Sequence, residues 1–337
     1  MTSPHVALHD VRKIFARKPD LAERIAIAMG LPKPPEVRAV DGVSLEVAHG
    51  EALGLVGESG CGKSTLGRIV AGVHSKTSGQ FAFEGKEETD WSPKDADRAR
   101  LDIQMIFQDP MSSLNPRKRI ADIIGEAPVV HGMVPARDKE AVVADLMQEV
   151  GLDPAYARRF PHQFSGGQRQ RIGIARALAV QPKFLVCDES VAALDVSIQA
   201  QVLNLFMDLR ERRGLTYLFI SHDLGVIEHL TDRVAIMYLG KIVEIGPTAE
   251  IFAGPAHPYT RALLAEAPRV GRGRRAYVPL KGELPSPLAP PPGCRFHTRC
   301  PHVMPICKTD EPKLKTIAPR RVAACHLNDN TDQEDRR

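Results

Sequence analysis

The chain has 337 residues, of which 43% are hydrophobic and 26% are charged, and its formal net charge is +4. This balance is ordinary for a globular protein with one large domain and an appendage, or with two domains. The small positive charge gives no argument for a nucleic-acid partner. No run of about 18 apolar residues occurs, and the first residues lack a signal-peptide pattern, so we expect a soluble, cytosolic protein without a membrane span.

Apolar runs and helical periodicities alternate along most of the chain. An edge strand is expected over His5–Phe15, and Lys18–Pro35 then interrupts the pattern with a short helix over Leu21–Met29 and a proline-rich loop. Further strands are predicted over Arg38–Val47, Ala52–Val56, Gly79–Glu84, Ile103–Phe107, Phe184–Cys187, Thr216–Ile220, Arg233–Tyr238 and Lys241–Ile245. Helices are predicted over Ser64–Ala71, Asp95–Arg100 and Ile198–Arg212, and helical spacing runs throughout Ile120–Ala179, including Lys139–Val150 and the segment after Ser165. This order predicts a parallel α/β core with an all-helical insertion.

The composition changes near Gly254, where proline and loop residues become frequent. We expect a separate appendage from there on. Its basic stretch reads as a solvated linker, with contact to anionic lipid as the alternative; the residues are Arg269, Arg272, Arg274 and Arg275. The polar and charged end from Asn328 to Arg337 predicts a disordered tail.

A glycine-rich stretch after the predicted strand Ala52–Val56 fits the pattern G-x-x-x-x-G-K-[ST], whose backbone N–H groups wrap phosphate oxygens. It reads Gly57-Glu58-Ser59-Gly60-Cys61-Gly62-Lys63-Ser64-Thr65. Lys63 can reach the β- and γ-phosphates of a nucleotide, and the Ser64 hydroxyl can ligate Mg²⁺. A chance glycine-rich turn is the alternative, but the order of strand, loop and helix favours a phosphate site.

Two carboxylates end the apolar run Phe184–Cys187. In a phosphate-loop nucleotide site, Asp188 would hold Mg²⁺ through water, and Glu189 would orient or deprotonate the attacking water. An apolar strand that ends in acids is common by itself. Paired with the phosphate loop, it predicts the second half of an ATP site.

A further motif, Ser165-Gly166-Gly167-Gln168, stands at a predicted helix start. With it the chain resembles the ATP-binding cassette (ABC) ATPases over roughly residues 5 to 255. Other landmarks follow in the family's order, namely the glutamine-loop residue Gln108, the dimer-contact residues Ala193-Leu194-Asp195 and the switch histidine His222. The resemblance implies a P-loop NTPase fold with a RecA-like α/β core, an antiparallel β subdomain and a helical insertion at about 110–180, all within residues 1–253.

The resemblance also implies how such a site works. The partner's Ser165, Gly166, Gly167 and Gln168 would cap the phosphate loop of the first subunit, so that ATP joins a head-to-tail dimer and hydrolysis separates it. His222 would sense the γ-phosphate, and Gln108 would join the magnesium shell. Phe15 is the candidate for stacking on adenine, with an ordinary core role as the alternative.

The chain departs from the family's usual pattern at Phe164, Ser190 and Val191-Ala192. None of these positions supplies a group that touches phosphate, metal or water, so we expect a competent ATPase. Cys61 and Cys187 are read as structural, although Cys61 would be sensitive to alkylation if bound nucleotide leaves it exposed.

Four of the six cysteines lie near the end, at Cys294, Cys300, Cys307 and Cys325, separated by five, six and seventeen residues. Four thiolates in a loop-rich segment can hold Zn²⁺ or an iron–sulfur cluster, and these wide spacings favour iron–sulfur. The nearby His297, His302 and His326 keep mixed ligation open, and four unligated cysteines are the remaining alternative.

The tail resembles the C-terminal extension of the oligopeptide and dipeptide importer ATPases, some of which carry a 4Fe–4S cluster. The matching stretches are Leu194–Gln201, Ala256–Thr260 and Cys294–Pro301, and they place the extension at 254–327. The resemblance implies a bacterial importer at the cytoplasmic face of the inner membrane, with a second ATPase, two permeases and an extracytoplasmic binding protein as partners. Peptides are the leading cargo, with nickel, opines or glycosides as alternatives.

Two other functions remain as competing hypotheses. A soluble ABC ATPase acting on nucleic acid or ribosomes is disfavoured because the chain holds one cassette and shows no basic aromatic surface. A subunit that binds ATP without turnover is disfavoured because Glu189 is present.

Overall fold

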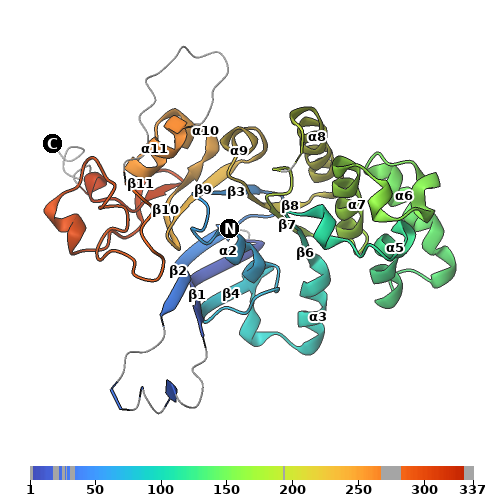
Figure 1. Cartoon of the computed structure of the whole chain (residues 1–337), viewed down its shortest axis with the longest axis horizontal. Helices are drawn as coiled ribbons and strands as arrows, with labels where there is room; N and C mark the ends of the chain where they lie inside the picture. Colours follow the sequence, from blue (N-terminus) through green and yellow to red (C-terminus); the bar gives the residue numbers. More distant parts are fainter. Residues whose placement is uncertain are drawn as a thin grey trace.

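The computed structural model describes residues 3–17, 23–24, 27, 29–30, 35–192, 194–266 and 282–329 (Figure 1). The predictions for the helix over 21–29 as a whole, for the basic stretch at 269–275, for Ala193 and for the tail beyond residue 329 therefore lie outside the described residues. Among the helices within those ranges, none combines the length and apolarity needed to cross a bilayer.

The smaller of the two sheets is antiparallel, with strand order β2-β1-β4-β5. Its strands are β1 (Val6–Ala16), β2 (Glu36–Val47), β4 (Ser78–Phe83) and β5 (Lys86–Glu87). The sequence predicted an edge strand for β1, and this was wrong, because β1 pairs with β2 on one side and with β4 on the other. Its first residues, Val6, Ala7 and Leu8, are all buried, as a central strand requires.

The larger sheet has the order β11-β12-β10-β9-β3-β8-β7-β6. Its parallel part consists of β3 (Ala52–Val56), β6 (Ile103–Ile106), β7 (Phe184–Asp188), β8 (Thr216–Ile220) and β9 (Arg233–Tyr238). Every residue of β3, β7 and β8 is buried, as expected for parallel strands covered on both faces.

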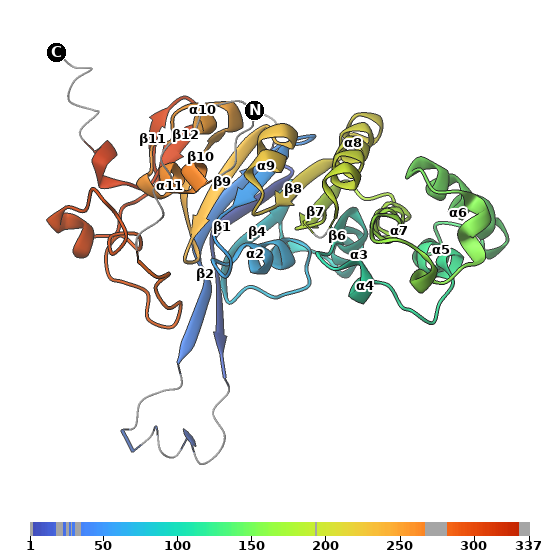
Figure 2. The ribbon, with the colours of Figure 1, turned by 45° about the horizontal axis from the view of Figure 1, so that its top comes forward.

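Alternate side chains of these strands enter two different cores. Leu53 and Leu55 of β3 pack with α2 (Lys63–Val70) and the antiparallel sheet. Ala52 and Val56 pack instead in the core that contains α8 (Val196–Arg213) and α9 (Leu224–Leu230). The parallel sheet therefore lies between two layers, and Figure 2 shows α2 and α9 on its opposite sides.

The chain between β6 and β7 is largely helical and lies at one end of the molecule (Figure 1). Its helices are α4 (Pro110–Ser113), α5 (Ile120–Val130), α6 (Lys139–Glu149) and α7 (Gly166–Leu178). Helix α3 (Pro93–Asp102) lies just before β6 and is not part of this segment. The sequence predicted helical spacing throughout Ile120–Ala179, but the helices there are interrupted. Short 3₁₀ turns intervene, and two of them begin at Pro154 and Pro161, because proline fits the first turn of a helix but cannot continue one.

The C-terminal part is joined to the larger sheet, which the sequence did not predict. After β10 (Lys241–Pro247) come α10 (Thr248–Ala253) and α11 (Pro258–Glu266), and later β11 (Lys315–Ala318) and β12 (Arg321–Ala323). Strand β12 pairs antiparallel with β10, with Ala323 opposite Glu244. The segment expected as a separate appendage thus extends the core sheet.

Glu244 fastens this junction from a fully buried position. Its carboxylate accepts backbone N–H bonds from Ala256 (2.9 Å) and His257 (3.0 Å), and an N–H from the Arg321 guanidinium at 2.8 Å. These three bonds offset the cost of removing the carboxylate from water, and they fix the relative positions of the three partners.

His257 lies beside Glu244 and is also buried. Its Nδ1 accepts the backbone N–H of Tyr259 at 3.0 Å, which places the proton of the neutral ring on Nε2. Burial lowers the pKa of His257 to about 4, and burial together with the neighbouring His49 lowers the pKa of His5 to about 4. Both rings are therefore neutral in the folded protein well below the pKa of a free histidine.

We predict that the free energy of unfolding falls as the pH drops from about 6.5 to about 4. The unfolded chain binds protons on these histidines in that window and the folded chain does not, so each contributes a loss of up to about 1.4 kcal/mol per pH unit. Urea unfolding at several pH values would measure the slope. His257→Asn should reduce the slope, whereas the same change at the exposed His131 should not; an unchanged slope in His257→Asn would contradict the assignment.

Candidate nucleotide site

The loop between β3 and α2 passes close to neighbouring backbone at two glycines. A Cβ on Gly57 would lie 2.1 Å from the carbonyl oxygen of Met237, and one on Gly62 would lie 2.0 Å from that of Ala39. Gly62 also has a φ of 111°, which side chains disfavour. Glycine is required at both positions, so the two fixed letters of the motif follow from packing as well as from phosphate access.

Lys63 begins α2 and curls back over the loop. Its side chain is buried, and Nζ donates to the carbonyl oxygens of Gly57 at 2.7 Å and Glu58 at 3.0 Å. The ammonium is held at the mouth of the loop, where the N-terminal end of α2 adds its partial positive charge. This end of the helix can therefore receive phosphate groups.

Ser64 and Asp188 meet at the inner edge of the site. The Ser64 hydroxyl donates to Asp188 Oδ1 at 2.8 Å, although the two residues are far apart in sequence. Burial raises the pKa of Asp188, and the bond from Ser64 opposes that shift. A hydroxyl and a carboxylate are hard oxygen ligands of the kind that Mg²⁺ takes beside phosphate, so this pair fits the predicted magnesium site.

Glu189 gathers two of the other predicted residues around one oxygen. Gln108, just after β6, donates Nε2 to Glu189 Oε2 at 2.7 Å, and His222 Nδ1, just after β8, lies 3.3 Å from the same oxygen. Glu189 itself has a positive φ of 48°, an unfavourable conformation for a residue with a side chain. With this backbone conformation, Glu189 lines the same cavity as the phosphate loop.

A cavity of about 250 Å³ opens between these residues. Its lining includes the loop from Ser59 to Thr65, together with Gln108 and Glu189. Sequence reasoning missed the remaining lining residues, which are Val37, Arg38, Ala39, Leu239, Gly240 and Pro287. Leu239 and Gly240 lie between the two predicted strands Arg233–Tyr238 and Lys241–Ile245, but no sequence signal links them to this loop, and Pro287 comes from the C-terminal part.

Several predicted residues do not line this cavity. Gly57, Glu58, Asp188 and His222 contact the lining residues Lys63, Ser64 and Glu189, whereas Phe15 and the signature residues have no such contact in the described part of the chain.

Phe15 does not line the cavity; the ring is 41% exposed and packs edge-on against His74. Phe15 does pair directly opposite Val37, which is part of the lining. Its role against adenine stays a prediction.

The signature residues also stand apart, at the start of α7. Ser165 and Gln168 form a reciprocal capping box there, with bonds of 3.0 and 3.3 Å between side chains and backbone. Gly167 packs against α8, where an added Cβ would meet Ile198 at 2.4 Å. None of the signature residues lines the cavity formed by the described part of this chain.

The two core cysteines are structural, as predicted. Cys187 is buried in β7, and burial raises the pKa of its thiol. Cys61 is only 1% exposed, and burial raises its thiol pKa as well. Because the reactive form of a thiol is the exposed thiolate, this environment does not support the predicted sensitivity of Cys61 to alkylation.

The four tail cysteines are free thiols; Cys294 and Cys307 are buried in the core that contains α8 and α9, Cys300 packs against that core, and Cys325 is partly buried. Burial raises the pKa of Cys294 to about 11, with further contributions from Cys307, Cys325 and Cys300. Among the described residues, however, no three histidine, cysteine, aspartate or glutamate side chains are grouped so that they could hold a metal ion. The arrangement does not support the predicted iron–sulfur site.

Comparison with known proteins agrees with this geometry. Residues 40–192 match the family described as ABC transporter, and residues 243–307 match the oligopeptide/dipeptide transporter C-terminal region. An oligopeptide transport ATP-binding protein of Bacillus subtilis, AppF, is 50% identical over 324 residues, covering 95% of this chain and 96% of that protein.

The chain belongs to the ABC transporter ATP-binding proteins. A di/tripeptide transport ATP-binding protein of Pseudomonas aeruginosa, DppF, is a further relative, at 46% identity over 91% of this chain and 95% of that protein. The predicted family and its ATPase activity are thereby confirmed, while the roles of the residues around Glu189 stay predictions.

Solved structures of ABC ATPases confirm the predicted P-loop NTPase fold. The cbiO1 subunit of Clostridium perfringens, part of the ABC transporter complex cbiONQ, superposes with a TM-score of 0.61 at 24% identity, covering 75% of this chain and 92% of that one. A dimeric ATP-binding cassette in a post-hydrolysis state with ADP and phosphate also gives 0.61, at 25% identity, covering 72% of this chain and 98% of that one.

We predict that Glu189→Gln lowers kcat for ATP hydrolysis by about 10²–10⁴-fold, because the amide cannot accept a proton from water. The affinity for ATP should change by less than about threefold, since the isosteric side chain still reaches Gln108 and His222. Phosphate release and equilibrium ATP binding measure the two quantities. Glu211→Gln on the exposed face of α8 is the matched control, and substantial turnover in Glu189→Gln would contradict the role of Glu189 as base.

Proposed function

We propose that this chain is the ATP-hydrolysing subunit of an importer for oligopeptides or dipeptides. One observation carries the proposal: the match of residues 243–307 to the oligopeptide/dipeptide transporter C-terminal region. The contacts of Ser64 with Asp188 and of Gln108 and His222 with Glu189 support ATP hydrolysis in the same chain. The names of AppF and DppF support peptides as cargo. Residues 1–253 would form the ATPase domain and 254–327 the extension.

ATP would bind in the cavity above the phosphate loop. Lys63 would release its bonds to the Gly57 and Glu58 carbonyls and turn to the β- and γ-phosphates. Ser64, Asp188 and Gln108 would hold Mg²⁺, which neutralises phosphate charge during attack. Glu189 would position the attacking water, and His222, which shares its carboxylate oxygen, would follow the γ-phosphate.

A second ATPase subunit would complete the site. The start of α7 supports this, because Ser165 and Gly166 are exposed and lie outside their own chain's cavity. In a head-to-tail pair, the N–H groups at the start of α7 in one subunit would face the phosphates bound by the other. ATP would then close the dimer and its hydrolysis would reopen it.

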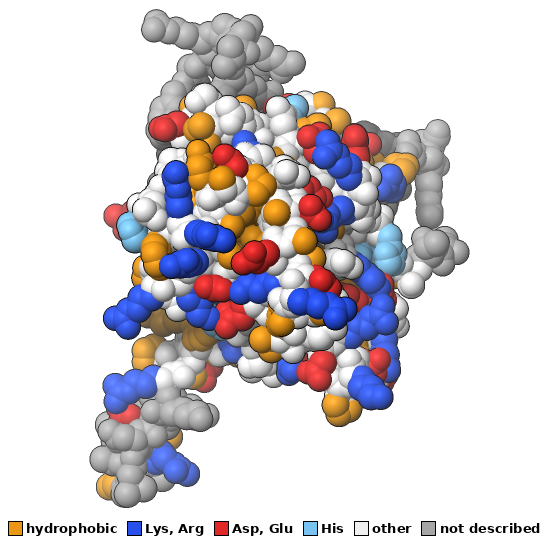
Figure 3. All heavy atoms as spheres, turned by 90° about the vertical axis from the view of Figure 1, so that its right-hand side faces the viewer, with side chains coloured by type: hydrophobic (Ala, Val, Ile, Leu, Met, Phe, Trp, Pro, Cys, Tyr) orange, Lys and Arg blue, Asp and Glu red, His pale blue; other side chains and the backbone are white. Residues whose placement is uncertain are grey.

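The helical insertion would contact membrane permeases at the cytoplasmic face of the inner membrane. Large apolar side chains are exposed there, at Met111 (55%), Val130 (73%) and Met133 (39%). Figure 3, which views this end of the molecule, shows hydrophobic side chains among mixed charges. The docked permease would lie near Gln108, which begins the insertion and donates a hydrogen bond to Glu189. A change in the occupancy of the ATP site would then alter the contact with the permease.

We expect peptide to stimulate ATP turnover when this chain is purified from membranes together with its permeases. The experiment adds a peptide-loaded or an empty binding protein and compares the ATPase rates, with Glu189→Gln as the inactive control. Stimulation by nickel, opines or glycosides instead would keep the importer and change its cargo. Failure to co-purify with any membrane protein would make the importer proposal wrong.

The iron–sulfur cluster stays a prediction, which rests on the spacing of the four cysteines and on the loop-rich segment that carries them. If it forms, protein purified without oxygen should contain about four iron and four sulfide per chain. Cys307→Ser should remove them, and Cys187→Ser in β7 should not. About one zinc per chain would assign a zinc site instead, and protein free of both would leave the thiols unligated.

A further inference from the structure

A salt bridge connects the C-terminal extension to the phosphate loop. The Nη1 of Arg299 donates to both carboxylate oxygens of Glu58, at 3.0 and 2.9 Å. The pair is largely enclosed, with side-chain exposures of 7% for Arg299 and 21% for Glu58. An enclosed ion pair is screened less than a surface one, and loss of one partner leaves a charge that must be solvated.

The backbone of Glu58 is held from the same side. Its N–H donates to the hydroxyl of Tyr259 in α11 at 2.8 Å. Tyr259 is fully buried, and its ring packs 4.6 Å from that of Tyr238, whose hydroxyl lies 3.4 Å from Arg299. Both the side chain and the N–H of one phosphate-loop residue are therefore bound by the extension.

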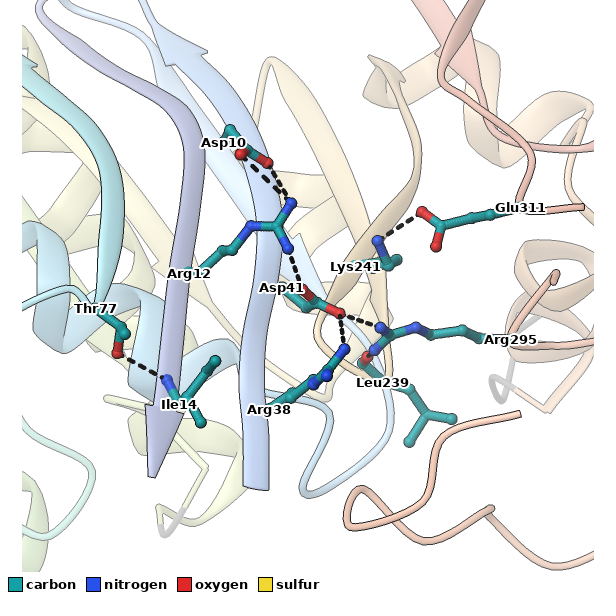
Figure 4. Close-up of polar contacts among 10 residues, drawn as sticks. All are labelled: Asp10, Arg12, Ile14, Arg38, Asp41, Thr77, Leu239, Lys241, Arg295 and Glu311. Carbon is teal, nitrogen blue, oxygen red and sulfur yellow. Dashed lines mark hydrogen bonds and ion pairs between the residues drawn. The ribbon is translucent and has the colours of Figure 1, made fainter. Parts of the chain in front are cut away.

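A second arginine of the extension holds the turn that supports the loop. Arg295 donates to the carbonyl oxygen of Leu239 and to the carboxylate of Asp41, on which Arg12 and Arg38 also converge (Figure 4). Next to Leu239, the N–H of Gly240 donates to the carbonyl oxygen of Cys61 at 2.8 Å. The phosphate loop is thus held by contacts of the extension at Glu58 and, through the Leu239-Gly240 turn, at Cys61.

We propose that Arg299 is a positioning residue for ATP binding, which acts through Glu58 to hold the phosphate loop in its nucleotide-receiving shape. The inference rests on the ATPase function proposed above and adds a role for the extension in it. Arg299 does not line the cavity, and its contact with the phosphate loop is the ion pair with Glu58, so any effect on ATP would pass through that residue. A loop that is already fixed before ATP binds loses less conformational entropy on binding. Removal of the Arg299–Glu58 ion pair would therefore weaken ATP binding.

Thermodynamic reciprocity extends the consequence to the tail. If the extension favours ATP binding through Glu58, bound ATP must stabilise the extension by the same free energy. ATP binding and the stability of the extension would then be coupled within one chain.

The test measures equilibrium binding of a fluorescent ATP analogue and steady-state hydrolysis by the full-length chain and its Arg299→Met variant. We expect Kd and KM to rise about tenfold while kcat changes less than about threefold, because the loop is misplaced only until ATP is bound. Arg299→Lys should recover part of the affinity. In a Glu58→Gln background, Arg299→Met should cause little further loss, as expected for two residues that act as a pair.

The matched control is Arg321→Met. Arg321 also joins the extension to the core through a buried glutamate, Glu244, but does not contact the phosphate loop. The Arg321→Met variant should have a lower melting temperature, and its Kd for the ATP analogue should stay within about twofold of wild type. If Arg321→Met weakens ATP binding as much as Arg299→Met does, the extension acts only through general stability and the proposal is overturned.

Tyr259→Phe provides a second variant that keeps the buried ring and removes only the hydroxyl. Kd should rise about two- to fivefold, since one hydrogen bond to the Glu58 N–H is lost. Unchanged ATP binding in folded Arg299→Met or in Tyr259→Phe would also overturn the proposal. If wild-type protein itself neither bound nor hydrolysed ATP, the proposed function would fail instead, so the two failures can be told apart.

Discussion

Parallel pairing of β6, β7, β8 and β3 is the constraint on which the rest of the structure depends. Because parallel strands all end at one edge of the sheet, the residues that follow them meet there although they are distant in sequence. Gln108 follows β6, Glu189 follows β7, His222 follows β8, and the phosphate loop follows β3. A single oxygen of Glu189 is thus reached by both Gln108 and His222.

This edge can be so crowded because each strand is buried on both faces. Side chains of β3 and β8 alternate between two cores, so close packing on both faces fixes where these strands end. Small residues then allow close approach where the loop crosses the neighbouring strands, at Gly57 and Gly62. The polar residues of the candidate site therefore follow buried apolar strands, and one of them, Glu189, has an unfavourable backbone conformation with a positive φ.

The extension is the less expected part of the architecture. Strand β12 continues the core sheet, Glu244 closes the junction, and Arg295 and Arg299 reach back toward the nucleotide site. A segment whose composition suggests an independent appendage contributes to the candidate nucleotide site, since Pro287 lines the cavity beside the phosphate loop. The extension and the ATP site are therefore one structural unit.

Sequence by itself determined the fold class and most of the chemistry. Short apolar runs locate the buried strands, the glycine and lysine spacing locates the phosphate loop, and the acids after Phe184–Cys187 mark the candidate metal and water residues, because each of these signals is local in the chain. Only the tertiary structure decided which residues meet across long separations. The pairing of Arg299 with Glu58, the central position of β1 and the continuation of the sheet by β12 depend on contacts that leave no spacing pattern in the chain. An arginine in a loop has the same sequence signature whether it is solvated or enclosed, and packing alone settles which it is.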